Sequence, residues 1–443
     1  MSRINADESQ TDVTRNDIEN AERPSLYSGE KKIVENVLIL QGGGSLGAFG
    51  CGVFKALAQK NVKIDIVAGT SIGGVNAAVI AGSKNENQPE KLLEEFWLEL
   101  TDNYIDLDKV SPSSYSHMEQ LIANYYLRSR TNEPGINELI LKAEQYRNKS
   151  FRSFLSSAIF GNEKMFKPRW RPEYVFTDPD YFEPAKWTYL YDHSALAKTL
   201  EKYIDYSKLK PGGNPNSRLI MTAVNVMTSE PLIFDSATEQ ITAKHILATC
   251  GYPMYNFPWV EVKEGVYAWD GGLLSNTPLR EVIEASPVND KRIFLVENYP
   301  KRIGTLPDSI PEVYHRTRDI IFCDKSVSTV KISKVITGYL RYIDELYQMV
   351  ENNVDKIKVD KSRLEQIRNK YKKYKLQTGA EIKRIYYISR DELFHSIYEN
   401  ADFSPETILD LIKEGERKTN QVVNNLNVNP QKLVPSSSQT STA

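Results

Sequence analysis

Cysteine is scarce in this chain. Among its 443 residues only Cys51, Cys250 and Cys323 are cysteines, and they lie far apart with no CxxC spacing. This usage suggests neither a disulfide framework nor a zinc site, and we expect no metal ion and no cofactor. It fits a reducing compartment, so we expect a cytoplasmic protein.

Long hydrophobic runs are absent as well. No window holds the roughly 18 uninterrupted apolar residues of a membrane-spanning helix, so any contact with a membrane would be peripheral. Residues 1–32 are polar and lack the apolar core of a secretory signal. We expect them to form a disordered arm, and we expect the low-complexity residues 429–443 to form a flexible tail.

The chain also lacks a substantial net charge of either sign. Its 56 lysines and arginines nearly balance 58 aspartates and glutamates. An attraction of the whole protein to nucleic acid is therefore not expected. The length predicts one large catalytic domain, which we place at 33–300, and an extension after it. These features specify no oligomeric state.

The N-terminal part has the pattern of an α/β protein. The apolar run 37–40, bounded by glycine, predicts a strand buried in a parallel sheet, and apolar residues at helical spacing follow in 48–58. A second strand is expected over 62–68, with a tightly packed helix of small residues after Ser71. Later strands are expected at four places, which are 219–226, 232–234, 265–272 and 292–298.

The rest of the chain is predicted to be mainly helical. The insert 105–190 is interrupted and dense in proline and aromatic residues, and it is either a lid over a pocket or a plain packed connection. From 301 to 428 we expect a helical extension. An apolar stripe at helical spacing covers 335–350, and the helix is predicted to continue through the charged run up to Lys375.

The end of this extension predicts one more strand and one more helix. The segment EIKRIYYIS has strand character. Ser404, followed by Pro405 and Glu406, starts a helix that would run towards Asn425. The basic run 368–375 favours either a membrane-surface patch or a solvated helix face.

A glycine-rich loop is the first motif that could carry chemistry. Residues 42–47, GGGSLG, satisfy GxGxxG between a predicted strand and a predicted helix. With Asp65 about twenty residues on, they match the fingerprint of an NAD(P)-binding Rossmann-type protein. Against this alternative, Asp65 stands in the middle of its predicted strand, whereas a ribose-binding acid belongs at the carboxyl end.

A second motif follows at once. Gly69-Thr70-Ser71-Ile72-Gly73 is a GxSxG turn between a predicted strand and a predicted helix. Such an elbow holds a serine on a strained turn, and the glycine two positions either side leaves room for the bend. Ser71 is therefore the candidate nucleophile, and a base must reach it.

Two kinds of base are open. Asp270 ends an apolar strand, and Gly271 and Gly272 leave room around its carboxylate, although the same pattern is common in plain turns. An α/β-hydrolase order would instead combine Ser71, Asp270 and His315. None of the histidines stands in a glycine-rich turn. The candidates are His117, His193, His245, His315 and His395.

Taken together and in this order, QGGGSLGAF, GTSIGG and WDGGLLSNTP resemble the three blocks of the patatin-like phospholipase family, which are GGGxxG, GxSxG and DGG. The resemblance covers about Val37 to Leu279. The segments YDHSALAKTL, VNVMTSE and LFHSIYENADFSPETILDLIKEGERKT extend it to a microbial subgroup with a C-terminal extension. It implies a three-layer α/β/α fold with a mostly parallel central sheet.

The resemblance also implies the chemistry of a serine esterase acting on lipid esters, of phospholipase A or lysophospholipase type. Ser71 would be the nucleophile and Asp270 the proton acceptor, with no histidine. The oxyanion hole would be formed by Gly42, Gly43 and Gly44, chiefly the last two. The supporting motif residues would be Gly47, Gly69, Gly73, Gly271, Gly272 and Asn276, the last as a brace for the turn that carries Asp270.

Two positions depart from the family pattern. The glycine loop opens with Gln41 where many members have aspartate, and Leu46 stands where many have a basic residue. Charge-based contacts with phospholipid headgroups are therefore not carried over. Besides the Rossmann alternative, a catalytically idle acyl-binding relative remains as a second alternative.

Overall fold

The computed structural model describes residues 33–102, 104–105, 149–213, 215–285, 289–356, 360–376, 381–391, 396 and 398–423. The predicted N-terminal arm and C-terminal tail lie outside these residues. So does most of the first half of the predicted insert, residues 106–148. Statements below refer to the described part of the chain.

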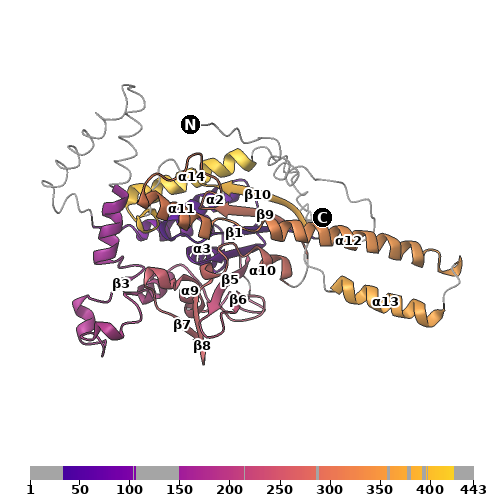
Figure 1. The fold of residues 1–443 in the computed structure, drawn as a ribbon, viewed down its shortest axis with the longest axis horizontal. Coiled ribbons are helices and arrows are strands. Elements are labelled where there is room, and N and C mark those ends of the chain that lie inside the picture. The colour runs from indigo at the N-terminus through magenta and orange to yellow at the C-terminus, as the bar shows by residue number, and fades with distance from the viewer. Residues whose placement is uncertain are drawn as a thin grey trace, which may run out of the picture.

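An eight-stranded mixed sheet forms the centre of the molecule (Figure 1). Five strands run parallel in the order β10-β9-β1-β2-β5, and β8, β7 and β6 complete the sheet in antiparallel pairings. Their bounds are β1 Val34–Leu40, β2 Ile66–Thr70, β5 Arg218–Asn225, β6 Pro231–Asp235, β7 Val260–Lys263, β8 Val266–Asp270, β9 Asp290–Glu297 and β10 Ile382–Ser389. The predicted α/β fold with a mostly parallel sheet is confirmed.

The alternation of side chains along β1 separates two cores, because successive residues of a strand point to opposite faces. Leu38 and Leu40 lie in the larger core, which includes residues of α2, α3, α4, α9 and α14. Val37 and Ile39 lie in a smaller core with residues of α10 and with Val330. The sheet is therefore covered on both faces, which is the three-layer arrangement.

Helices cover both faces of the sheet. Their bounds are α2 Gly47–Gln59, α3 Ile72–Ala81, α4 Pro89–Glu99, α8 Ser194–Leu200, α9 Ala243–Cys250, α10 Leu279–Glu284 and α14 Pro405–Val423. A Cβ on Gly52 of α2 would overlap the carbonyl oxygen of Ile412, and one on Gly415 would overlap that of Phe49. Helices α2 and α14 therefore pack with their backbones in contact.

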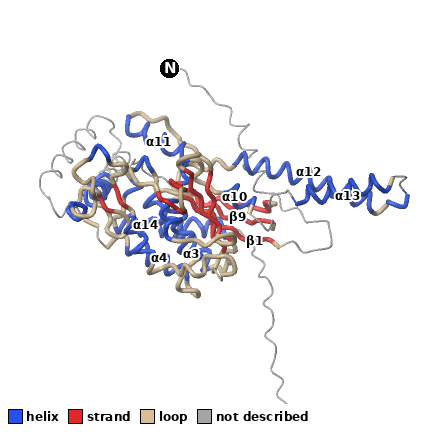
Figure 2. Tube along the Cα trace, turned by 90° about the horizontal axis from the view of Figure 1, so that it is seen from below, coloured by secondary structure: helices blue, strands red, loops and turns tan. Residues whose placement is uncertain are grey.

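Part of the chain after residue 300 packs into this body, and part of it projects away. Strand β10 pairs with β9, and α14 packs on α2. Between them in sequence come α11 Ile310–Phe322, α12 Val327–Glu351 and α13 Lys361–Leu376. Figures 1 and 2 show α12 projecting from the body with α13 beside it. No helix of the described residues is long and apolar enough to span a bilayer.

Two predictions of element boundaries are wrong. The predicted helix through Lys375 is two helices, because α12 ends at Glu351 and the chain turns at Asn352 and Asn353. The two helices are joined by the Arg368–Glu351 ion pair at 2.7 Å and by stacked rings of Tyr347 and Tyr371. The second predicted strand begins at Ile66 rather than residue 62, so Asp65 precedes it.

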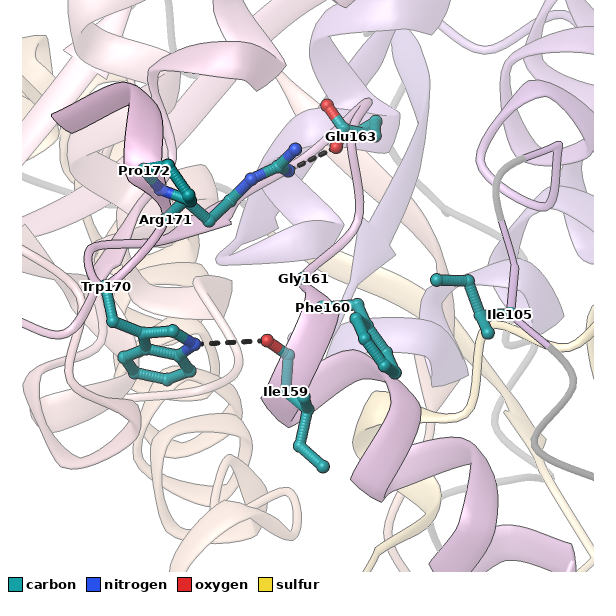
Figure 3. Close-up of a pocket in the computed structure, with 8 residues that line it drawn as sticks. All are labelled: Ile105, Ile159, Phe160, Gly161, Glu163, Trp170, Arg171 and Pro172. Carbon is teal, nitrogen blue, oxygen red and sulfur yellow. Dashed lines mark hydrogen bonds and ion pairs between the residues drawn. The ribbon is translucent and has the colours of Figure 1, made fainter. Parts of the chain in front are cut away.

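The described part of the insert contains a helical stretch at 149–160 and the short strand β3 Lys167–Pro168, which pairs with β4 Tyr191–Asp192 just after the insert. A cavity of about 390 Å³ opens within it (Figure 3). The cavity is lined by Ile105, Ile159, Phe160, Gly161, Glu163, Trp170, Arg171 and Pro172. The Trp170 indole N–H donates to the carbonyl oxygen of Ile159 at 3.3 Å. None of the predicted site residues lines this cavity.

Candidate active site

Ser71 occupies a strained turn between β2 and α3. Its φ of 58° and ψ of −132° lie in a region that side-chain-bearing residues rarely adopt. A Cβ on Gly69 would overlap the backbone of Gly73, and one on Gly73 would overlap the carbonyl oxygen of Leu40. Both glycines are therefore required for the turn, as the GxSxG pattern predicts.

The backbone of Ser71 is held by a threonine. The Ser71 N–H donates to the Thr249 hydroxyl oxygen at 3.0 Å, and this hydroxyl donates to the carbonyl oxygen of Thr222 at 2.7 Å. Because both bonds are satisfied inside the protein, they fix the elbow to β5 and α9. The serine side chain itself remains partly accessible.

Asp270 lies beside Ser71 at the end of β8. The two strands that carry them are bridged by β5, where Thr70 pairs with Thr222 and Asp270 pairs with Ala223. Only 1% of Asp270 is exposed. Burial raises the pKa of its carboxyl to about 7, while hydrogen bonds from the Ser71 side chain and from the Gly272 N–H lower it. The structure thus places a buried carboxylate, that of Asp270, beside the side chain of Ser71.

Gly271 and Gly272 shape the turn around this carboxylate. A Cβ on Gly271 would lie 2.6 Å from the carbonyl oxygen of Thr222, which leaves no room for a side chain. The Gly272 N–H donates to Asp270 Oδ1 at 2.7 Å. The pair therefore lets the strand end directly against β5 and orients the carboxylate.

The glycine loop places two backbone N–H groups near the elbow. Gly43 and Gly44 have φ values of 152° and 59°, which only glycine adopts readily. Among the hydrogen bonds of the described residues, none uses the N–H of Gly43 or Gly44. The Gly42 N–H, in contrast, donates to Asn276 Oδ1 at 2.9 Å. Two of the three predicted donors are thus available to a ligand, and the third is occupied.

Asn276 connects the parts of the site in a way that the sequence did not indicate. We expected it to brace the turn that carries Asp270. Its side chain accepts from Gly42 and donates to the carbonyl oxygen of Phe322 at 3.0 Å. It therefore ties the glycine loop and the end of α11 to the segment that follows Asp270.

Residues 38–283 match the family described as patatin-like phospholipase. The chain belongs to the patatin-like phospholipase family. No curated protein sequence is significantly similar to it.

Among solved structures, this patatin-like chain is similar to VipD from Legionella pneumophila, with 17% identity and a TM-score of 0.37 over 90% of this chain and 67% of VipD. It is also similar to ExoU of Pseudomonas aeruginosa in complex with SpcU, with 16% identity and a TM-score of 0.24 over 65% of this chain and 49% of that chain. The chain thus spans about half the length of ExoU. These similarities are too distant to transfer an activity.

Residues from the C-terminal part hold the glycine loop of this patatin-like protein. The Asn400 amide donates to the carbonyl oxygen of Gly43 at 3.0 Å and to the Tyr299 hydroxyl at 2.6 Å. Arg318 in turn donates to Asn400 Oδ1 at 2.7 Å. Sequence reasoning missed Asn400, because no motif marks a contact between residues 357 positions apart in the chain.

A buried cluster of charged residues contacts Asn400 through Arg318. Arg318 contacts Asp319 at 2.8 Å and Glu399 at 2.7 Å, and Arg390 contacts Glu399 at 3.1 Å. Burial raises the pKa of Glu399, but the charges of Arg390 and Arg318 outweigh it and hold that pKa well below its usual range. A charged Glu399 therefore stays paired beside the loop.

The described histidines of the patatin-like protein lie in other settings. His193 is buried and contacts the carbonyl oxygen of Leu247 at 2.9 Å, and His245 completes the capping box of Thr242 at the start of α9. His315 is part of the cluster with Arg318, Asp319 and Glu399. His117 and His395 lie outside the described residues. The side-chain base whose pKa responds to the Ser71 side chain is Asp270.

The position of Asp65 argues against the Rossmann alternative. It accepts a hydrogen bond from the Asn36 N–H at 2.9 Å, before β2 begins. The glycine loop follows the carboxyl end of β1, whereas Asp65 precedes the amino end of the parallel strand β2. Asp65 and the loop therefore lie at opposite ends of the strands. Within the described residues, no group of three His, Cys, Asp or Glu side chains is arranged to hold a metal ion.

Proposed function

We propose that this protein hydrolyses acyl esters of lipids, phospholipids or lysophospholipids, through a dyad of Ser71 and Asp270. The observation that carries the proposal is the position of the buried Asp270 carboxylate beside Ser71, on strands that β5 joins, with its pKa raised to about 7. A base with a pKa near the working pH combines a useful ionised fraction with proton affinity. An aspartate with an ordinary pKa near 4 would be much weaker.

In the first half-reaction, Asp270 takes the hydroxyl proton of Ser71 while Oγ attacks the carbonyl carbon of the ester. The carbonyl oxygen becomes an oxyanion, which accepts hydrogen bonds from the N–H groups of Gly43 and Gly44. When the C–O bond to the alcohol breaks, Asp270 returns its proton to the leaving alcohol oxygen. The products are the alcohol and an acyl ester of Ser71.

In the second half-reaction, Asp270 takes a proton from water, and the hydroxide oxygen attacks the acyl carbonyl carbon. The same two N–H groups stabilise the second oxyanion. The bond to Oγ breaks, Ser71 regains its proton from Asp270, and the fatty acid leaves. Each half-reaction moves one proton through Asp270, so no histidine is required.

The burial of the glycine loop bears on substrate contacts. Gln41 and Leu46, where many family members carry charge, are each only 1% exposed. The Gln41 amide donates to the Thr277 hydroxyl oxygen at 2.8 Å, and its carbonyl oxygen accepts from the Asn298 N–H. Both positions therefore serve the interior of the loop, and headgroup recognition falls to other residues.

The test compares wild-type protein with Ser71→Ala and Asp270→Asn in the hydrolysis of p-nitrophenyl acyl esters and of a panel of phospholipids. Each variant is expected to lose about a thousandfold or more in kcat, because the two side chains act as one unit. A fluorophosphonate should label Ser71 at one equivalent. Ser229→Ala is a matched control, since Ser229 also has a positive φ of 61° but lies in a surface turn.

Full activity in Asp270→Asn would refute the dyad. Labelling of wild-type Ser71 without turnover of any ester would instead favour the catalytically idle relative. If His315→Ala alone abolished labelling while the protein stayed folded, the α/β-hydrolase alternative would replace the dyad.

A further inference from the structure

Helix α11 has its polarity reversed relative to an ordinary surface helix. Its buried face carries the polar or charged side chains of His315, Arg318 and Asp319, together with Phe322. Large apolar residues are exposed at helical spacing on the other face, and they are Ile310, Val313, Tyr314, Ile320 and Ile321. We call these five residues the outer face of α11. A helix that exposes its apolar stripe to water needs a partner that is itself apolar.

The buried face of α11 adjoins the candidate active site through Phe322, at the end of the helix. The Phe322 carbonyl oxygen accepts from Asn276, and its ring packs against Tyr252 and Tyr299. Tyr252 in turn packs against Tyr255. Burial raises the pKa of the Tyr255 hydroxyl, the charge of Arg318 lowers it, and the charge of Asp270 raises it. Tyr255 is 43% exposed. It therefore links the outside of the molecule to the catalytic carboxylate.

Further apolar side chains are exposed on the segments that border Asp270. Leu273 and Leu274 directly follow the Asp270 turn, and Met254 precedes Tyr255 after α9. All three are exposed, Met254 most of all. Two segments that shape the surroundings of Asp270 thus expose apolar side chains, as α11 does.

The charge around α11 complements an anionic surface. Between residues 302 and 331 the exposed charged residues are Arg302, Lys325 and Lys331, against Asp308 alone. The whole chain, in contrast, has a net charge of -2. A cationic margin around an apolar face is the pattern by which peripheral proteins hold anionic lipid.

We propose that the outer face of α11, with Met254, Tyr255, Leu273 and Leu274, docks the protein on the surface of an anionic phospholipid bilayer. The inference rests on the proposed function, because a lipid ester is reached at such a surface. Docking there brings the lipid directly to Ser71 and Asp270. The apolar side chains enter the headgroup region, and Arg302, Lys325 and Lys331 contact the phosphates.

A second copy of the chain fits this surface less well. In a twofold dimer the patch would meet itself, so the same cations would face one another. Such a contact would also cover the segments that border Asp270. A lipid surface meets neither obstacle.

Binding can be tested apart from catalysis by using Ser71→Ala protein and co-sedimentation with vesicles of phosphatidylcholine and phosphatidylglycerol. The double variant Ile320→Asp/Ile321→Asp is expected to reduce the bound fraction about tenfold or more, since two exposed apolar side chains that would enter the lipid are replaced by charges that anionic lipid repels. The control is Met227→Asp/Ile233→Asp, which adds the same charge at two exposed apolar residues of the β5–β6 hairpin.

The charges provide a second variant. Lys325→Glu/Lys331→Glu should weaken binding to phosphatidylglycerol vesicles severalfold and change binding to pure phosphatidylcholine much less. Circular dichroism and thermal unfolding confirm that each variant is folded. Equal effects of the α11 variant and its control would overturn the proposal, and so would vesicle binding that neither variant changes.

Two outcomes separate this proposal from the proposed function. If wild-type protein cleaves no ester but binds vesicles through α11, the docking surface stands and the hydrolase proposal fails. If monomeric esters are cleaved but vesicles are not bound, the docking surface fails alone. A change from dimer to monomer in Ile320→Asp/Ile321→Asp, seen by light scattering without a change in vesicle binding, would assign the surface to a second copy instead.

Discussion

Two regions of the molecule differ in how much apolar surface they expose. The body around α2 and α3 buries its apolar side chains, whereas the segment from α11 to α13 exposes many of them. All ten residues of α3 are buried, and so are ten of the thirteen residues of α2. In α12, by contrast, the apolar stripe is exposed at Ile332, Val335, Ile336, Tyr339, Ile343 and Leu346. The body uses small residues to bring backbones together, whereas the projecting helices leave large residues uncovered. Close backbone packing at the site comes from the first region, and exposed apolar surface comes from the second.

Substitutions of one glycine in each region test this comparison with the largest expected effect. Gly52→Ala should destabilise the protein by about 3 kcal/mol or more, because its Cβ would meet the backbone of Ile412, which cannot move aside. Gly338→Ala in α12 should stabilise it by up to about 1 kcal/mol, because no atom lies within 4 Å of the new Cβ and alanine favours a helix. Urea unfolding of both variants measures the two signs.

Equal effects at the two glycines would contradict the comparison. A small loss in Gly52→Ala would mean that α14 can shift away from α2 without cost. A large loss in Gly338→Ala would mean that another surface lies against α12 in solution.

Asn400 gives the next largest effect. Asn400→Leu removes the donor to the Gly43 carbonyl oxygen, so the glycine loop loses one of its supports and the two N–H groups lose their orientation. We expect kcat on a monomeric ester to fall about ten- to a hundredfold with little change in KM. Asn400 acts as a positioning residue in this account.

The matched control is Asn353→Leu, because the Asn353 side chain also donates to a carbonyl oxygen, that of Met349, but does so near the end of α12. It should leave kcat unchanged. Asn400→Gln, which keeps an amide donor, should recover part of the rate. A rise in KM with an unchanged kcat in Asn400→Leu would contradict the positioning role.

The parts of the site that the sequence predicted are those whose residues are neighbours in the chain. The glycine loop, the elbow and the Asp270 turn each fit within a few residues, and their glycines are required by contacts that any such turn would make. Asn400, Thr249 and Arg318 reach the site only through the packing of α14, α9 and α11. No local pattern encodes those distances.

The same reasoning applies to the fold. Seven of the eight strands of the sheet were predicted from apolar runs, including EIKRIYYIS, whereas β7 was not. The place of β10 beside β9 depends on long-range pairing. The helix predicted through Lys375 was wrong for a related reason. The charged run has helical propensity throughout, and the break after Glu351 is accompanied by tertiary contacts between Arg368 and Glu351.

The raised pKa of Asp270 predicts opposite effects of pH on activity and stability. Activity requires the ionised form, so kcat/KM on a monomeric ester should rise with pH and level off above about 7. The folded protein binds the proton more tightly than the unfolded chain does. The contribution of Asp270 to stability is therefore lost as pH rises from the unfolded pKa near 4 through the folded value of about 7.

Asp270→Asn tests both effects at once. It should be inactive yet more stable than wild type by about 1–2 kcal/mol at pH 8, with a smaller difference at pH 5, because the cost of a buried charge is removed. Denaturant unfolding at the two pH values measures this. A variant less stable than wild type at pH 8 would show that the ionised carboxylate is well solvated.

The smallest effect is expected on the exposed stripe of α12. Ile336→Ser and Tyr339→Ser should each change the free energy of unfolding by less than about 0.5 kcal/mol, because both side chains already face water. Val330→Ser in the same helix should cost about 2 kcal/mol or more, since Val330 is fully buried in the smaller core. Chemical unfolding at low protein concentration compares the three. A loss above about 1 kcal/mol in either stripe variant would mean that α12 is covered in solution, and a loss that grew with protein concentration would identify the cover as a second copy.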